Sequence, residues 1–232
     1  MDVETIIKNS PVKLSDKDIK ALRDGSEELE YQTWEEVKSA ITAGETGRLR
    51  RSPRDLRNYI VWHAEIGKTH GSVVEYVRRE RLHWPDPIIA RNAKPFAHPD
   101  DWKVIWNDWP YHLADGIMHL VVWSKSRIAV DPETGLPTEE STRMIESFLD
   151  QTFGDALGCR RGEDLVWFKQ KTESQSVKAL EHIHVMLRNV PVERVEKLIG
   201  QQRSQTLQVL VGNSIGVGLL PITQPGPRRP AK

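Results

Sequence analysis

The chain of 232 residues is short of cysteine and of long apolar runs, and both shortages exclude whole classes of protein. Cys159 is the single cysteine, so neither an intramolecular disulfide nor a cysteine-based zinc site can form within one chain. The most apolar stretch, residues 207–222, is broken by Gly, Asn, Gln and Ser and falls short of the roughly 18 residues of a membrane helix. The acidic N-terminus has no apolar core of signal-peptide length. We therefore expect a cytoplasmic protein with no membrane partner.

An excess of charge of one sign is also lacking, because 33 Lys and Arg residues balance 33 Asp and Glu residues. Any argument for a polyanionic partner must therefore come from a local cluster. The length allows one domain, since domains typically have roughly 100–200 residues. Residues 1–12 and 221–232 are predicted to be flexible tails, the second because it is rich in Pro, Gly and polar side chains. A single domain over residues 13–220 remains.

Helices are predicted first and strands later along the chain. Cap residues and apolar spacing predict helices, and short runs of β-branched and aromatic residues predict strands. The predicted helices are 15–24, 33–43, 53–66, 72–80, 139–153 and 191–200, and the predicted strands are 118–124, 165–169 and 182–188. Helices gathered at the N-terminus and strands in the second half favour an α+β domain, with a helical part packed on a mainly antiparallel sheet.

The strand predicted over residues 182–188 carries the strongest candidate for chemistry. Side chains alternate between faces along a strand, so His182, His184, Met186 and Arg188 are expected on one accessible face, with the intervening residues in the core. Two imidazoles beside a guanidinium suit acid–base work near neutral pH. A polar face that makes ordinary hydrogen bonds is the alternative. A metal would need a third ligand, such as His119 on the strand 118–124, and we predict no metal and no cofactor.

Arginines gather in two segments that are candidates for binding phosphates. Guanidinium groups make bidentate phosphate contacts, and nearby aromatic side chains could stack on exposed bases, so the segments suit RNA. Solvated helix faces paired with carboxylates are the alternative. The residues are Arg48, Arg50, Arg51, Arg54 and Arg57 in the first segment, and Arg78, Arg79 and Arg81 in the second.

An aromatic block over residues 100–111 contains three Trp, one Tyr and three Asp. Such a composition suits a pocket for a cation or a flat ring, with Asp108, Trp109 and Tyr111 as candidate substrate-binding residues together with His119. Packing in the core is the alternative, and it is the usual reason for large aromatic side chains. Asp24 and Glu27 belong to an acidic group that could receive a guanidinium, or that simply ends a helix in solvent.

Several blocks in the same order resemble the fungal family of N-acetylglucosamine-induced proteins over residues 14–200. They are SPRDLRNYIVW, ERLHW, PFAHPDDWKVIWNDWPYHLADGIMHLVVWSK, VDPETG, WFKQ and SVKALEHIHVMLR. Some members of that family are similar to arginine-containing cyclodipeptide synthases, which join arginine to a second amino acid from aminoacyl-tRNAs. The resemblance therefore implies a cytoplasmic enzyme of secondary metabolism with arginyl-tRNA among its partners.

The resemblance also implies roles for particular residues. An aminoacyl-tRNA ester is already activated, so the reaction needs a base, donors for an oxyanion, and positioning. His182 or His184 would be the base, and Arg188 or a backbone amide would stabilise the oxyanion. The family is associated with an Asp-x-x-Glu pair, and that spacing falls on Asp24 and Glu27. The Arg segments would hold the tRNA.

Two other functions are compatible with these residues. The segment His-Ile-His-Val-Met resembles the strand of a histidine-triad nucleotide hydrolase or transferase, but Met186 occupies the position of the third histidine. A regulator that responds to an amino sugar and performs no catalysis is the other. Analysis of the products in an expression host distinguishes the three, because only the synthase would give a cyclic arginine dipeptide.

Overall fold

The computed structural model describes the chain except for residues 1, 26–28, 172–176, 178 and 204–232. The predicted C-terminal tail and Glu27 lie outside the described residues. In chain order the elements are α1 (Val3–Lys8), α2 (Asp16–Asp24), α3 (Trp34–Thr42), η1 (Thr46–Arg48), α4 (Pro53–His70), α5 (Val73–Tyr76), η2 (Val77–Leu82), η3 (Pro99–Asp101), β1 (Trp102–Trp106), β2 (Met118–Ser124), α6 (Glu139–Leu149), η4 (Asp150–Gly154), α7 (Asp155–Leu157), β3 (Leu165–Phe168), β4 (Glu181–Leu187) and α8 (Val192–Ile199).

The predicted helices form where their cap residues place them. Ser15 begins α2 and Thr33 begins α3, each with a capping box in which the side chain three residues later bonds back to the cap. Helix α4 starts with Pro53 at its first position, where a missing N–H does no harm. Helix α2 ends at Gly25, whose φ of 61° lies in the left-handed region that glycine adopts without strain. Local signals therefore fix the starts of these helices, whereas α4 continues to His70, beyond its predicted end at residue 66.

The sheet has the order β1-β2-β4-β3, and every neighbouring pair is antiparallel. The fold is therefore the α+β arrangement that the sequence predicts. The three predicted strands are present, with β2 over the expected residues. Strand β1 was not predicted, because its residues were interpreted only as part of the aromatic block. The burial along Trp102–Trp106 does not alternate, since the last three residues are all buried, so the pattern gave no signal for a strand.

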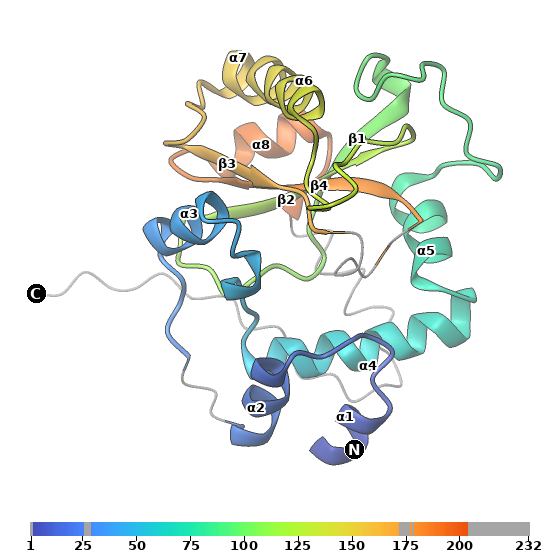
Figure 1. Ribbon diagram of the computed structural model, residues 1–232, viewed down its shortest axis with the longest axis vertical. Coiled ribbons are helices and arrows are strands. Elements are labelled where there is room, and N and C mark those ends of the chain that lie inside the picture. Colours follow the sequence, from blue (N-terminus) through green and yellow to red (C-terminus); the bar gives the residue numbers. More distant parts are fainter. Residues whose placement is uncertain (1, 26–28, 172–176, 178, 204–232) are drawn as a thin grey trace, which may run out of the picture.

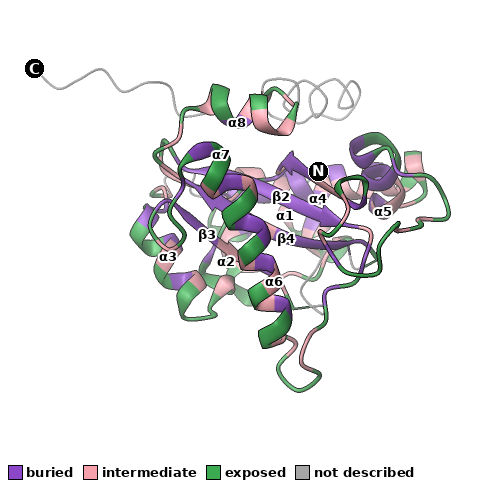
Figure 2. Ribbon diagram, turned by 90° about the horizontal axis from the view of Figure 1, so that it is seen from above, coloured by how far each residue is buried: buried purple, intermediate pink, exposed green. Residues whose placement is uncertain are grey.

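Helices cover both faces of the sheet, with α6, α7 and α8 on one side and α1, α2 and α4 on the other (Figure 1). Ile183, Val185 and Leu187 of β4 point into the first layer, against Ile145 and Phe153. The opposite face packs on α4 and α5 near β1 and on α3 near β3. All of β2 and all of β4 except His184 are buried (Figure 2). The prediction of an accessible sheet face, which came from the alternation along residues 182–188, is therefore wrong.

The N-terminus also departs from the prediction, because residues 3–8 form α1 and not a flexible tail. Asp2 caps the helix by accepting a hydrogen bond from the N–H of Thr5, and Ile6 is buried among residues of α2 and α4. Three apolar side chains, Val3, Ile6 and Ile7, were too weak a signal for a helix of six residues.

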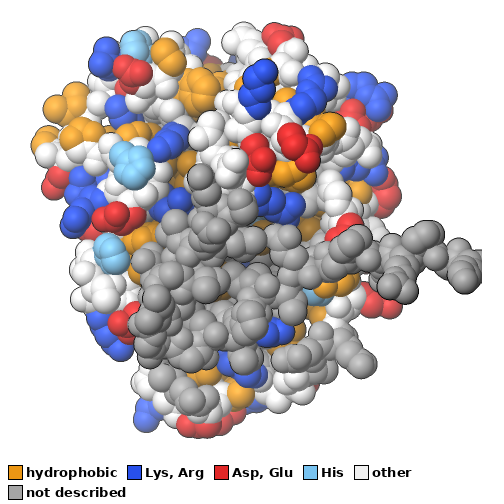
Figure 3. Space-filling view, turned by 180° about the vertical axis from the view of Figure 1, so that it is seen from behind, with side chains coloured by type: hydrophobic (Ala, Val, Ile, Leu, Met, Phe, Trp, Pro, Cys, Tyr) orange, Lys and Arg blue, Asp and Glu red, His pale blue; other side chains and the backbone are white. Residues whose placement is uncertain are grey.

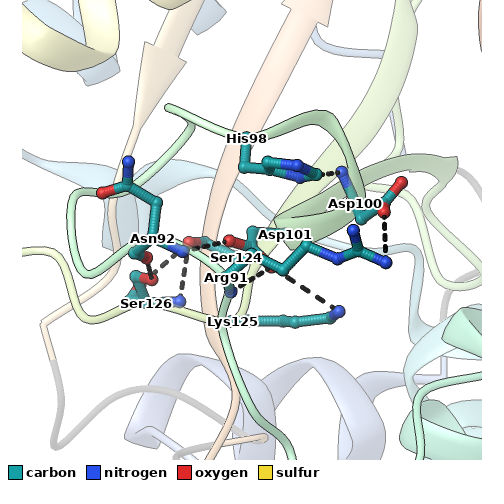
Figure 4. A network of polar contacts seen from close by, with 8 residues as sticks. All are labelled: Arg91, Asn92, His98, Asp100, Asp101, Ser124, Lys125 and Ser126. Carbon is teal, nitrogen blue, oxygen red and sulfur yellow. Dashed lines mark hydrogen bonds and ion pairs between the residues drawn. The ribbon is translucent and has the colours of Figure 1, made fainter.

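A buried carboxylate fastens the long segment before β1 to the sheet (Figure 4). The two oxygens of Asp101 accept hydrogen bonds from the backbone N–H groups of Arg91 and Asn92 at 2.9 and 2.8 Å. Lys125 approaches the same carboxylate at 3.6 Å. Ser126 ties in the segment from the other side by donating to the carbonyl of Asn92. Asp101 thus satisfies donors that the loop could not pair by itself.

Candidate active site

The sheet register gathers three histidines on the face that α3 and α4 cover. His182 pairs with Trp123 across β2 and β4, and His184 pairs with Val121 on one side and with Phe168 of β3 on the other. His119 pairs with Met186, so His119 and His184 are diagonal neighbours on the same face. The predicted sharing of one face by His182, His184 and Met186 is thus correct, and the structure adds His119.

His119 and His184 are joined by a hydrogen bond of 2.9 Å between Nε2 of His119 and Nδ1 of His184. Asn107 orients the pair. Its Oδ1 accepts from the backbone N–H of Trp109, so its Nδ2 is turned toward the His119 ring, at 3.0 Å from Nε2 and 3.2 Å from Nδ1. When Nδ1 of His184 carries the proton and donates to His119, Nε2 of His184 is left as a lone pair. That nitrogen makes no hydrogen bond to any residue that the structure describes.

The surroundings of both imidazoles favour the neutral form. Burial lowers the pKa of His119 and that of His184 well below the ordinary value, and the charge of Arg51 lowers them further. His184 is the half-buried member, stacked on Phe168 at 4.7 Å between ring centres, whereas His119 is buried and stacked on Tyr111 at 5.0 Å. A neutral, oriented imidazole with a free nitrogen is the arrangement of a general base.

Arg51 and Tyr111 border the histidine pair. The Arg51 guanidinium donates through Nε and Nη2 to the carbonyl of Trp109 at 3.1 and 2.9 Å, and it lies 4.6 Å from the ring centre of Tyr59. It lies 5.3 Å from the ring centre of Tyr111, whose hydroxyl accepts from Gln170. Arg51, Tyr111 and His184 are half-buried, so this part of the face retains contact with solvent.

His182 and Arg188 occupy different surroundings from His184. His182 is buried, with Nδ1 at 2.9 Å from the carbonyl of Leu180 and its ring against Trp123, and burial lowers its pKa. Arg188 follows the far end of β4, where its Nε donates to the carbonyl of Glu163 and its guanidinium lies 4.8 Å from the Trp34 ring. The fully buried Met186 separates Arg188 from His184 along this face.

The residues of the aromatic block mostly pack in the core or border the site. Trp109 is buried against Tyr59 and Trp62, which confirms core packing for that side chain. Asp108 forms a bidentate ion pair with Arg81, with N···O distances of 2.9 and 2.6 Å and little exposure of either side chain. The carboxylate of Asp108 is therefore neutralised by Arg81 and does not face a substrate. Tyr111 and His119 do border the candidate site.

The eight arginines do not form one phosphate-binding surface. Arg78 and Arg81 are buried in ion pairs with Glu75 and Asp108, which corrects their assignment to tRNA. Arg48 and Arg79 are exposed beside Glu45 and Glu80. The remaining members are Arg50, which is exposed, and Arg51, Arg54 and Arg57, which are half-buried. On the face in Figure 3, Lys and Arg side chains alternate with Asp and Glu outside the grey residues.

Three further features complete the description. Asp24 is exposed at the last position of α2. Within the described ranges, no three His, Cys, Asp or Glu side chains gather in a way that could hold a metal ion. No helix in the same ranges is long and apolar enough to cross a membrane. Sequence reasoning missed Asn107, since an Asn between two Trp-rich runs carries no signal of contact with a strand that begins eleven residues later.

The fold and the site define an α+β protein with a hydrogen-bonded histidine pair on its sheet. The chain belongs to the family described as Protein of unknown function (DUF3605), whose model matches residues 33–188. It is 25% identical to N-acetylglucosamine-induced protein 1 of Candida albicans over 193 residues, which are 75% of each chain. It is 30% identical to an uncharacterized protein of Saccharomyces cerevisiae over 169 residues, which are 72% of this chain and 83% of the relative.

A solved structure has the same fold. A crystal structure of HTC1 aligns with a TM-score of 0.57 and 26% sequence identity, over 82% of this chain and 99% of the other. The resemblance to N-acetylglucosamine-induced proteins is thus confirmed at the level of the family, whose molecular function these relatives leave open.

Proposed function

We propose that the protein is a cyclodipeptide synthase that joins arginine and a second amino acid, both delivered as aminoacyl-tRNAs, and that His184 is its general base. The observation that carries the proposal is the hydrogen bond of 2.9 Å between His119 and Nδ1 of His184, which leaves Nε2 of His184 without a partner among the described residues. His119 acts through His184, so it is a positioning residue. Met186 is fully buried at the position of a third triad histidine, which favours this proposal over a nucleotide hydrolase.

The reaction needs only proton transfer and positioning. The α-amine of one aminoacyl-tRNA attacks the ester carbonyl of the other, so a C–N bond forms and the bond from the carbonyl carbon to the ribose oxygen breaks. His184 takes the proton from the amine and returns it to the leaving ribose hydroxyl. A second aminolysis within the dipeptidyl ester closes the ring and releases the second tRNA. No ATP is required, because both esters are already activated.

The remaining sequence-based roles rest on the resemblance. Asp24, with Glu27, stays the candidate for recognising the arginyl group, and Arg188 stays a second candidate for the oxyanion. Four arginines stay candidates for binding the tRNA backbone, because a guanidinium cation attracts a backbone phosphate. They are Arg48, Arg50, Arg54 and Arg57.

The test is product formation after expression of the full chain in a bacterial host, followed by mass spectrometry of the extract. Wild type should give a cyclic dipeptide that contains arginine. His184→Gln should lower its yield by about 10²–10⁴-fold at equal soluble protein, because the base is lost. His83→Asn is the matched control, since His83 is exposed and Asn tolerates its φ of 57°. A wild-type extract without such a product, or equal yields from His184→Gln and wild type, refutes the proposal.

A further inference from the structure

Arg51, like Arg50, Arg54 and Arg57, forms no ion pair among the described residues, but its guanidinium differs from theirs because it is held by hydrogen bonds to the Trp109 carbonyl. Arg48, Arg78, Arg79 and Arg81 each form an ion pair with a nearby carboxylate. Arg51 forms none with any residue in the part of the chain that the structure describes. Its guanidinium is nevertheless half-buried and held in one orientation by the Trp109 carbonyl and by two Tyr rings.

Such a guanidinium lacks the anion that normally accompanies a cation withdrawn from water. A cation withdrawn from water is normally neutralised by a carboxylate, because the lost hydration must be replaced. The two contacts with the Trp109 carbonyl use Nε and one N–H of Nη2, and the Tyr rings cover the faces of the group. The Nη1 edge keeps its donors, and a fork of donors fixed in place suits a phosphate.

We infer that Arg51 is the phosphate-binding residue of this site, and that its ligand is the phosphate of a nucleotide. This inference rests on the proposed function for the source of the nucleotide, which would be the 3′ end of an aminoacyl-tRNA, with a free nucleotide as the other source. The half-buried Tyr111, which contacts both Arg51 and His119, offers an aromatic wall to the ribose or base beside that phosphate.

The position of Arg51 relative to His184 agrees with such a ligand. Arg51 contacts Tyr111, Tyr111 stacks on His119, and His119 is next to His184, and the charge of Arg51 lowers the pKa of His184. In an aminoacylated terminal nucleotide, a ribose separates the 5′ phosphate from the ester carbonyl. A phosphate on Arg51 therefore leaves the ester free to reach His184. The same phosphate would offset the charge of Arg51, so binding of the ligand would make His184 a stronger base.

The experiment is isothermal titration of the full chain with AMP, inorganic phosphate and adenosine at low salt. AMP should bind wild type, and Arg51→Gln should weaken this binding at least about 10-fold, since a charge-assisted contact is lost. Arg143→Gln is the matched control, because Arg143 is exposed on α6 on the other side of the sheet, and it should bind within about 2-fold of wild type. AMP that binds more tightly than phosphate assigns the site to a nucleotide, and equal binding assigns it to free phosphate. Adenosine that binds as tightly as AMP overturns the inference.

A second measurement uses wild type alone, because Arg51→Gln also removes a bond to the Trp109 carbonyl and could unfold the chain. Phenylglyoxal modifies accessible guanidinium groups, and peptide mapping by mass spectrometry separates Arg51 from Arg143. AMP should slow modification of Arg51 several-fold and leave Arg143 unchanged. Equal protection of the two, no protection, or no binding of AMP and phosphate to wild type overturns the inference. Binding that depends on Arg51 without any cyclic dipeptide refutes the synthase and leaves the phosphate site standing.

Discussion

Replacing Asp101 by Asn should destabilise the protein strongly, although the two side chains have the same shape. Each carboxylate oxygen of Asp101 accepts one backbone N–H, from Arg91 and from Asn92. An amide offers one oxygen and turns its NH₂ toward the other N–H, so one buried donor is left without a partner. The residue has no exposed surface, and water cannot replace the lost bond.

The expected loss follows from these contacts. A buried backbone donor without a partner costs about 1–3 kcal/mol, and the hydrogen bond that remains loses its assistance by charge. Lys125 also loses its negatively charged partner. Together these terms give a loss of about 2–5 kcal/mol, a large part of the roughly 5–15 kcal/mol by which a domain is stable.

The assay is urea unfolding of both variants at neutral pH, followed by Trp fluorescence. Asp100→Asn is the matched control, because Asp100 is exposed and its ion pair with Arg91 contributes little. Its midpoint should stay close to that of wild type. An Asp101→Asn variant within 1 kcal/mol of wild type, or equal losses from the two variants, would show that the buried carboxylate does not hold the segment before β1.

The pH dependence gives the same prediction a sign. Burial would raise the pKa of Asp101, but the N–H groups of Arg91 and Asn92 and the charge of Lys125 outweigh it and hold the pKa below its ordinary value. The stabilisation by the charged form is therefore complete above the pKa of the unfolded chain, and it is lost as the pH falls through the lowered pKa of the folded state. The difference between wild type and Asp101→Asn should shrink in acid.

Three other predictions use neighbouring parts of the fold. Val185→Ala should lower the free energy of unfolding by about 1–3 kcal/mol in urea, because it leaves a cavity between β4 and α6, while the folded fraction keeps its activity. Arg81→Ala should lower the melting temperature far more than Arg79→Ala, because it strands a buried carboxylate. Cys159 should react with a disulfide reagent at pH 8 much more slowly in the folded chain than in urea, since burial raises its pKa to about 11.

The sequence was sufficient for elements that local signals specify. Ser15 and Thr33 with their capping boxes located two helices, and the β-branched residues of β2 and β4 located the inner strands. Alternation along β4 also placed Ile183, Val185 and Leu187 in the core correctly. Such signals act over a few residues, so one sequence carries them in full.

The parts that failed depend on contacts between distant segments. Alternation showed which residues share a face with His184, but it could not show that α3 and α4 cover that face. The ion pair of Asp108 with Arg81 joins residues 27 positions apart, so each side chain looked available when considered alone. Arg51 was one arginine among eight, and what distinguishes it is a pair of hydrogen bonds to the Trp109 carbonyl, 58 positions away.

The place of the histidine pair on the two inner strands has a consequence for how the protein opens. Strands β2 and β4 are hydrogen-bonded on both sides, whereas α1 and α2 are held to the rest mainly through α4. The outer helices belong to the part that can detach in local unfolding, and the inner strands to the part that opens only with the whole molecule. The amide hydrogens of His119 and His184 should therefore exchange among the slowest in the protein. The two imidazoles should stay aligned while α1 and α2 detach from the rest and pack against it again.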